Sequence, residues 1–442
     1  MKNVRVLTLS RQFALVMTIG LLSLQSMAQF SMSGEIRPRA EYLHGFKTLA
    51  ASNQDHAFFV DQRTRLNFEY RAEDFETFIQ VQDIRTWGSS SQLNRSDGFQ
   101  SIHQAWGKLK FNDKFNMKLG RQEIILDDHR IFGSVAWAQQ ARSHDALIFG
   151  YKDPTVTAQL GGAYNQNGPQ LNTTFYSVPK NYKAIQYLWL NKVFSKKLDV
   201  SVLFLNNGIQ ATKSDTSGNV VGWKDNYSQT FGTSARFGSG KLTGRASFYY
   251  QMGVHGDWSN TEIAAMNGRL DLLYKASDKF SIEGGYEYLS GTSQIDIANK
   301  KLNSFNPFYG TNHKFNGYMD YFYVGNHAGS VGLQDGFLGF AFKKEKYVVK
   351  LIGHYFLAAA DVMDVAEFAS TGTYKAMSPG LGQEVDLVFV YKLAKGVMLQ
   401  GGYSQMLGTE TMVAIKGGST SEISNWSWMM LTFKPNFYES KK

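Results

Sequence analysis

Short segments in which polar and apolar residues alternate recur along the whole chain. In the segment 60–70, Leu66, Phe68 and Tyr70 fall on one face of an extended chain, because successive side chains of a strand point to opposite faces. The residues between them are polar or charged, namely Asp61, Arg63, Arg65, Asn67 and Glu69. The same pattern recurs in further segments, clearly at 115–119 and 241–249 and more weakly at 426–433. The pattern predicts strands whose two faces meet different solvents.

The pieces between these segments come in two sizes. Short turns such as 112–114 and 344–346 contrast with long pieces at 88–98, 208–224 and 290–312. Alternating short and long connections are typical of an outer-membrane barrel. About nineteen segments are long enough for a tilted membrane strand of roughly ten residues. Because single-chain bacterial barrels have even strand numbers, we expect an all-β transmembrane antiparallel β-barrel of about eighteen strands, with sixteen next. Segment 315–322 is the weakest candidate strand.

The amino terminus has the three parts of a secretory signal peptide. Basic residues at Lys2, Arg5 and Arg11 precede an apolar core at 13–24, and a small-x-small site ends at Ala28. The apolar core is shorter than the ~20 residues of a membrane helix. We therefore expect residues 1–28 to be a cleaved signal peptide. Residues 29–442 would then form one barrel domain with long extracellular loops in the outer membrane of a Gram-negative bacterium.

Composition narrows the chemistry further. The chain contains no cysteine, which excludes disulfides, thiolate metal sites and a lipid-modified cysteine. It has only 7 prolines in 442 residues, and no linker divides it. The net charge of +9 is spread along the chain, so we interpret it as the lining of an anion path rather than a nucleic-acid surface. The 9 histidines show no repeated ligand spacing, and no glycine-rich phosphate loop is present, so no metal or other cofactor is expected.

The densest polar stretch, 119–151, contains three arginines, Arg121, Arg130 and Arg142. Two interpretations are open. The stretch is either a solvated loop whose charges satisfy one another or a loop folded into the lumen, where the arginines form a cationic constriction. Guanidinium groups suit the second task because they stay charged and grip carboxylates through two hydrogen bonds. Rings of such side chains favour anions in pores.

Further arginines fall on the polar side of alternating strands. Arg63 and Arg65 share one face because they are two residues apart, as do Arg37 and Arg39. Arg245 and Arg269 also lie on polar faces. An arginine facing lipid at the membrane midplane costs about 2–4 kcal/mol, a penalty that fades toward the rim. We therefore expect Arg63 and Arg65 to line the lumen, with a rim position as the alternative.

One ordered set of motifs resembles the alginate-export porin family of Gram-negative outer membranes. It consists of Gly120-Arg121-Gln122, Asp128, Arg130, Gly133, Trp137, Arg142 and Asp145. Segments 313–320, 382–387, 402–404 and 425–435 resemble the Bacteroidetes-type members of that family. The resemblance implies a monomeric barrel of eighteen strands whose arginine-lined lumen passes an anionic polysaccharide such as alginate. It also implies that Arg121, Arg130, Arg142 and Asp145 are constriction residues. The chain departs from the family in its polar ending, 439–442, and in acidic residues crowding the expected constriction.

The expected function is therefore an outer-membrane porin or exporter for anionic solutes. Its partners would be membrane lipid, the anionic solute or polysaccharide and, for export, periplasmic components. One alternative is an outer-membrane enzyme. The run Ser143-His144-Asp145 contains the residue types of a hydrolytic triad, but neighbours in a strand point to opposite faces and cannot converge, so no enzyme is expected. The other alternative is a structural barrel that is blocked by its own loops.

Overall fold

The computed structural model describes residues 29–326 and 329–440. The expected signal peptide, 1–28, lies outside the described residues. The strands are β1 (Gln29–His44), β2 (Ala57–Arg71), β3 (Phe75–Thr86), β4 (Gln100–Lys110), β5 (Phe115–Gln122), β6 (His144–Lys152), β7 (Val156–Tyr164), β8 (Ala184–Ser195), β9 (Leu198–Ser214), β10 (Val220–Ser239), β11 (Leu242–Val254), β12 (Glu262–Lys275), β13 (Phe280–Leu289), β14 (Leu333–Lys344), β15 (Tyr347–Leu357), β16 (Gly380–Ala394), β17 (Val397–Gly408), β18 (Ser424–Phe433) and β19 (Asn436–Glu439). The helices are η1 (Asn312–Lys314), α2 (Val365–Thr371) and α3 (Glu410–Lys416). In the described part of the chain, no helix has both the length and the apolar character that crossing a membrane requires.

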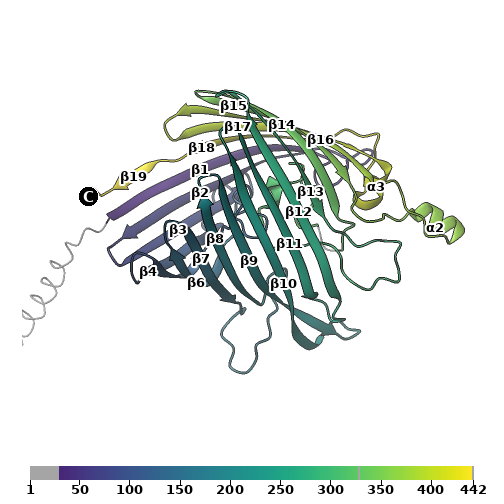
Figure 1. The fold of residues 1–442 in the computed structure, drawn as a ribbon, viewed down its shortest axis with the longest axis horizontal. Helices are drawn as coiled ribbons and strands as arrows, with labels where there is room; N and C mark the ends of the chain where they lie inside the picture. Colours follow the sequence, from purple (N-terminus) through teal and green to yellow (C-terminus); the bar gives the residue numbers. More distant parts are fainter. Residues whose placement is uncertain (1–28, 327–328, 441–442) are drawn as a thin grey trace, which may run out of the picture.

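The strands β1 to β18 form the wall of one closed antiparallel barrel (Figure 1). Each strand pairs with its neighbour in the sequence, and β18 pairs with β1 to close the ring, for example at Ala40 and Met429. The short β19 follows Pro435 and continues along the edge of β1, where it pairs with Met32 and its neighbours. The wall therefore has eighteen strands, which confirms the predicted fold and number. The weak candidate 315–322 is not a strand in the structure and belongs to a loop.

The connections differ between the two ends of the barrel. At the end where β1 begins and β18 finishes, neighbouring strands are joined by tight turns, such as 72–74 and 395–396. At the opposite end the connections are long, as at 87–99, 123–143 and 358–379, and this end carries α2 and α3 (Figure 1). Tight turns on the periplasmic side and long loops outside are the pattern of outer-membrane barrels.

The prediction of a long loop at 208–224 was wrong. There β9 and β10 continue past the neighbouring strands as a paired hairpin, and only 215–219 forms the turn. The Asp215 side chain closes this turn by accepting hydrogen bonds of 2.9 Å from the backbone N–H groups of Ser217 and Asn219. A strand that has left the membrane needs no lipid-facing row of apolar residues, so the alternation by which strands were recognised is absent from it.

The two faces of the wall follow the predicted alternation. On β2, the side chains of Arg63 and Arg65 are buried inside the barrel, whereas Phe58 and Leu66 are exposed on the outside. The outer face carries aromatic pairs near the tight turns, such as Phe115 and Tyr151, whose ring centroids lie 4.8 Å apart. Aromatic girdles of this kind mark the membrane interface.

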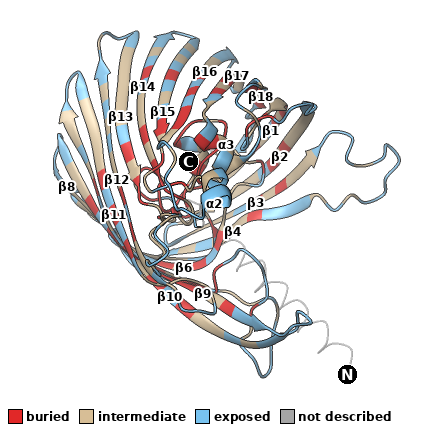
Figure 2. Ribbon diagram, turned by 90° about the vertical axis from the view of Figure 1, so that its right-hand side faces the viewer, coloured by how far each residue is buried: buried red, intermediate tan, exposed pale blue. Residues whose placement is uncertain are grey.

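The core of the molecule lies in the lumen. Several of its most deeply buried large side chains come from loops rather than strands, among them Phe132, Phe305 and Tyr321. Figure 2 shows buried loop segments inside the ring of strands. A barrel of this width leaves an aqueous interior that its own wall cannot fill, so loops supply the packing.

The outward face of β12 gives a test of the membrane position. Leu270 is exposed there, between the outward-facing Met266 and Tyr274. We expect Leu270→Arg to lower the free energy of unfolding by about 2–4 kcal/mol, because an arginine at membrane depth must face lipid. The measurement is a urea titration of the protein folded into lipid vesicles. Leu270→Ala is the control for the lost side chain, and an equal effect of both variants would contradict the outward assignment.

Candidate functional site

Two loops leave the wall and meet inside the barrel. Inner loop A is residues 123–143, between β5 and β6, and inner loop B is the described residues 290–326 and 329–332, between β13 and β14. They are joined by backbone hydrogen bonds, from Gly133 N to Tyr309 O at 2.9 Å and from Thr311 N to His129 O at 2.9 Å. A third bond runs from Val135 N to the Thr311 hydroxyl at 3.0 Å. The loops therefore form one continuous layer across the lumen.

The junction of the two loops needs glycine at two positions. A Cβ added at Gly133 would lie 2.3 Å from the Thr311 hydroxyl oxygen. A Cβ added at Gly310 would lie 2.2 Å from the backbone oxygen of Arg130. Carbon and oxygen atoms without a bond between them do not approach so closely, so any side chain here would separate the loops. Gly133, one of the residues of the family motif, is therefore required for the packing of the two loops.

A buried ion cluster fixes the junction to the wall. Arg130 of inner loop A pairs with Glu287 of β13, and both side chains are fully buried. Its guanidinium lies over the Phe315 ring at 3.9 Å and donates to the Asn316 side-chain oxygen at 3.1 Å. Glu287 also accepts a hydrogen bond of 2.7 Å from Arg269 of β12. One carboxylate thus faces two guanidinium groups, which makes its removal costly.

Inner loop B is held by other acidic residues of the wall. The Asn316 side-chain amide donates to Glu287 at 3.0 Å and to Asp335 of β14 at 3.1 Å. The backbone N–H of Met319 donates to Glu384 of β16 at 2.8 Å. Gly317 has a φ of 81° and lies directly against the Glu384 carboxylate, where a side chain would not fit. These contacts hold loop B against β13, β14 and β16.

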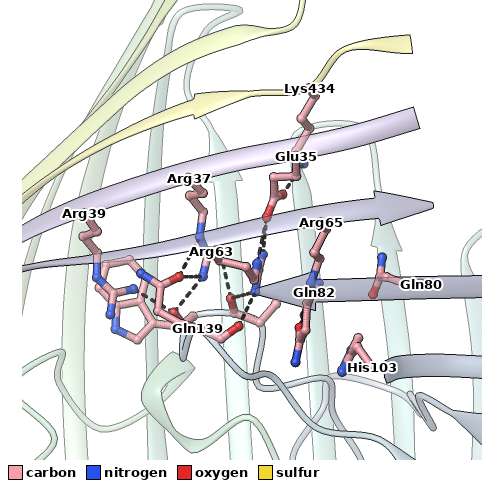
Figure 3. A network of polar contacts seen from close by, with 12 residues as sticks. Glu35, Arg37, Arg39, Arg63, Arg65, Gln80, Gln82, His103, Gln139 and Lys434 are labelled. Carbon is pink, nitrogen blue, oxygen red and sulfur yellow. Dashed lines mark hydrogen bonds and ion pairs between the residues drawn. The ribbon is translucent and has the colours of Figure 1, made fainter. Parts of the chain in front are cut away.

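Four arginines of β1 and β2 are buried in the lumen beside inner loop A, and three of them contact it. Arg37 and Arg39 come from β1, and Arg63 and Arg65 from β2; we call these four residues the arginine row (Figure 3). All four side chains are buried, and Arg37 and Arg63 lie opposite each other in the strand register. In the structure, the side chains of Arg63 and Arg65 point into the lumen, as predicted.

The arginine row donates mainly to the backbone of inner loop A. Arg37 bonds Ala136 O at 2.8 Å and the Gln139 side-chain oxygen at 2.7 Å. Arg39 bonds Trp137 O at 2.7 Å. Arg63 reaches the backbone oxygens of Ala136 at 3.3 Å and Gln139 at 3.2 Å. Figure 3 shows Arg37, Arg39 and Arg63 directed toward the loop around Gln139, whereas Arg65 points to Gln82. The loop therefore occupies donors that are suited to an anion.

The arginine row carries more positive charge than its neighbours neutralise. Arg63 pairs with Glu35 at 2.6 Å, and Arg39 pairs with Glu41 at 2.7 Å. Arg65 donates only to the neutral Gln82 side chain, at 2.9 Å. Among the residues that the structure describes, neither Arg37 nor Arg65 has a carboxylate oxygen within ion-pair distance. The row therefore keeps two uncompensated positive charges.

Trp137 joins the arginine row to both inner loops. The Arg39 guanidinium lies 4.0 Å from the centroid of the Trp137 ring, and the His313 ring stacks on it at 4.7 Å with an angle of 15° between the planes. The Trp428 ring of β18 contacts the indole edge-on at 4.7 Å. Aromatic contacts of this kind contribute about 0.5–1.5 kcal/mol each beyond the buried area.

The remaining residues predicted for a constriction lie in two different places. Arg142 is at the loop junction, where it donates to Gly310 O at 3.0 Å, and burial lowers the pKa of its guanidinium. Arg121 and Asp145 do not face the lumen. On β5, Arg121 shares its face with the exposed Leu119, and it pairs across the outer surface with Asp145 of β6 at 2.8 Å.

This outward position corrects the expected site of Arg121 and Asp145. The loop of which they were taken to be part begins only at residue 123, so both residues belong to strands and follow strand alternation. They lie at the end of β5 and the start of β6 near the long loops, and the two charges neutralise each other. An ion pair near the rim escapes the large penalty of the membrane midplane. The sequence could have indicated this position, because the alternation of segment 115–119, continued by two residues, places Arg121 on the same face as Leu119.

Two cavities flank the layer formed by the inner loops. A cavity of about 790 Å³ lies against β9 to β15 and is lined by Arg245, Lys314 and Asp127, among others. Burial lowers the pKa of the Lys314 ammonium, which donates to Asp128 O at 2.9 Å, and burial raises the pKa of the Asp127 carboxyl. A cavity of about 370 Å³ lies on the other side and is lined by Arg39 and Gln139. The arginine row therefore borders open space at one end.

Several residues of the layer were absent from the sequence prediction. Gln139 lies in the polar stretch 119–151, and His313 and Asn316 lie in the motif segment 313–320. None of them was predicted as a site residue, because their partners are far away in the chain. Glu287 and Glu384 lie on polar faces of β13 and β16, so their inward direction was accessible from alternation. Alternation does not indicate which loop these two residues would hold.

Comparison with known proteins supports the fold. No family model and no curated protein matches the chain. Among solved structures, the chain is similar to OccAB4 of Acinetobacter baumannii, with 12% identity over 93% of this chain and 99% of that one and a TM-score of 0.61. It is similar to OccK2 (OpdF) of Pseudomonas aeruginosa, solved in complex with glucuronate, with 10% identity over 92% and 97% and a TM-score of 0.58. It is also similar to OpdK of Pseudomonas aeruginosa, solved with vanillate, with 9% identity over 92% and 99% and a TM-score of 0.55. The fold is that of outer-membrane channels of Gram-negative bacteria.

The Glu287 cluster gives a test of what holds the layer. We expect Glu287→Gln to lower the free energy of unfolding by about 3–5 kcal/mol, because the buried Arg130 loses its counter-charge. The measurement is a urea titration in lipid vesicles. Glu262→Gln is the matched control, since Glu262 forms an exposed ion pair with Lys301, and such pairs contribute little. Equal stability of both variants would argue against the cluster as the anchor.

Proposed function

We propose that this chain is an outer-membrane channel for solutes that carry a carboxylate. The observation that carries the proposal is the arginine row, which brings four guanidinium groups together on one wall of the lumen with only two paired carboxylates. Guanidinium groups bind carboxylates through two parallel hydrogen bonds. A row of them along a pore attracts anions and lowers the cost of removing their hydration water.

The ligands of two similar channels agree with this class of solute. Glucuronate, in the OccK2 structure, is a sugar acid, and vanillate, in the OpdK structure, is an aromatic acid. Both are small carboxylates, and both fit the chemistry of the arginine row. At identities of 9–10%, these ligands suggest the class of solute to test.

A uronic-acid polysaccharide such as alginate is the extended form of this solute class. Its support is the resemblance of the motifs around Arg130 and Arg142 to the alginate-export porins and the uronate chemistry that the arginine row suits. Export of a polymer would require periplasmic components behind the channel, and the barrel would act as a monomer. Passage of a chain would also require space through the layer of inner loops A and B.

A structural barrel blocked by its loops is the second candidate function. The observation in its favour is the continuous layer that joins inner loops A and B across the lumen. Conductance separates the two candidates, because a blocked barrel passes no current in a planar bilayer.

Ion selectivity tests the role of the arginine row. We expect the folded protein to be anion-selective in planar bilayers and Arg37→Gln and Arg65→Gln each to lower the anion-to-cation permeability ratio about fivefold, the effect of roughly 1 kcal/mol of lost Coulomb energy. Both residues donate only to neutral groups, so the substitutions remove uncompensated charge. Arg121→Gln is the matched control and should leave selectivity unchanged, because Arg121 is on the outer face. A closed or cation-selective wild-type channel would contradict the proposal.

Block by oligouronates tests whether the channel passes a uronic-acid polysaccharide. If alginate passes along the arginine row, oligoguluronate or oligomannuronate should block the small-ion current of the wild-type channel in a concentration-dependent manner. The neutral oligosaccharide of equal length is the control for simple obstruction. Equal block by charged and neutral oligosaccharides would contradict the passage of a uronic-acid polysaccharide, but not the proposal of a channel for small carboxylates.

A further inference from the structure

We infer that residues 135–141 of inner loop A, which we call the cover segment, occupy the arginine row in place of a carboxylate and are displaced by the solute that the channel carries. The inference rests on the proposed function and adds a regulation to it. A solute that binds the row would open its own path.

The chemistry of the contacts allows this exchange. The cover segment binds the row through the neutral backbone oxygens of Ala136, Trp137 and Gln139, at 2.7–3.2 Å from Arg37, Arg39 and Arg63. A carboxylate offers two charged oxygens to the same donors. A carboxylate adds the Coulomb attraction of a full negative charge, and it can accept two parallel bonds from one guanidinium, which a single backbone oxygen cannot. An arriving anion therefore competes favourably for the donors that the segment holds.

The cover segment is a lobe closed at its base. The backbone N–H of Arg142 donates to Ser134 O at 2.7 Å, which joins the two residues that flank the segment. The base stays anchored to inner loop B through the bond from Arg142 to Gly310 O at 3.0 Å. Movement of the lobe gives up the bond from Val135 N to the Thr311 hydroxyl. The two loops stay joined through the backbone bonds of Gly133 and Thr311 and through Arg142, which lie outside the segment.

Both ends of the lobe have a left-handed backbone. The φ angles are 51° at Val135 and 56° at Ala141. A β-branched residue rarely adopts this conformation, since its Cβ substituents clash with the neighbouring carbonyl. The covered arrangement therefore holds Val135 in a conformation that its sequence disfavours, and departure of the lobe from the row can relax it.

The Trp137 indole opposes the movement. It lies between Arg39 and His313 and contacts Trp428, so displacement must break these contacts. The solute has to supply more binding free energy than the segment loses, which sets a threshold concentration for opening. The same contacts return the segment to the row when the solute has passed.

A reversible cross-link tests whether the segment must move. The chain has no cysteine, so Gln82→Cys and Gln140→Cys together introduce the only two thiols. The two positions are adjacent, since the Gln82 side-chain amide donates to Gln140 O at 3.2 Å. A short bis-methanethiosulfonate joins the segment to β3, and a reductant releases it, so one protein provides the free, fixed and released states.

The readout is glucuronate flux into liposomes. We expect the cross-link to lower the flux about tenfold and the reductant to restore it, because the fixed segment cannot exchange with the anion. Each single-cysteine variant treated with the same reagent is the control for the added groups. Unchanged flux in the fixed state would overturn the inference while leaving the channel proposal intact. No flux of any anion in the wild-type protein would overturn the channel proposal itself.

Truncation of the indole is an independent test. We expect Trp137→Ala to lower the glucuronate concentration for half-maximal flux about tenfold, which corresponds to ~1.4 kcal/mol of lost aromatic contact. Trp258→Ala, in the loop 255–261 away from the row, is the matched control and should leave that concentration unchanged. An unchanged or raised concentration in the Trp137 variant would contradict the threshold that the indole sets.

Discussion

One buried carboxylate, that of Glu287, holds both inner loops at their position inside this barrel. A wall of eighteen strands is too wide for its side chains to meet across the lumen, so the interior must come from loops. Loops carry polar backbone and need fixed partners to be held at one position. Glu287 supplies them, because it binds Arg130 of inner loop A, Asn316 of inner loop B and Arg269 of β12. Both inner loops are therefore joined to the wall at one point by this cluster.

Charged residues of the wall hold the two inner loops on different sides of the lumen. On the side of β13 to β16, acidic residues such as Asp335 and Glu384 are covered by inner loop B and are not exposed to a solute. On the side of β1 and β2, the arginine row contacts inner loop A through bonds to neutral oxygens. The acidic residues of β14 and β16 therefore hold inner loop B, whereas three arginines of the row hold inner loop A. This division follows from which loop packs against which wall.

The sequence was sufficient to predict the strands of the wall, but not the layer that inner loops A and B form in the lumen. Alternation in segment 60–70 predicted the inward direction of Arg63 and Arg65, because a strand between lipid and water has no other arrangement. It did not predict the extended β9–β10 hairpin, since outside the membrane both faces meet water. Arg121 and Asp145 were misplaced because their polar neighbours suggested a loop. The pairing of Arg130 with Glu287 spans 157 residues and depends on the folded path of both inner loops, which no local pattern encodes.

The seam of the barrel has a consequence for assembly. The ring closes where β18 and β19 pair with β1, and the arginine row lies on β1 and β2 beside that seam. Trp428, against which Trp137 packs, is on β18, and Lys434 lies 3.7 Å from Glu35 of the row's ion pair. The contacts around the arginine row are therefore complete only when the last strands of the chain have docked on the first. A barrel whose synthesis or insertion stops before β18 would lack both the closed wall and the Trp428 ring that packs against Trp137 beside the row.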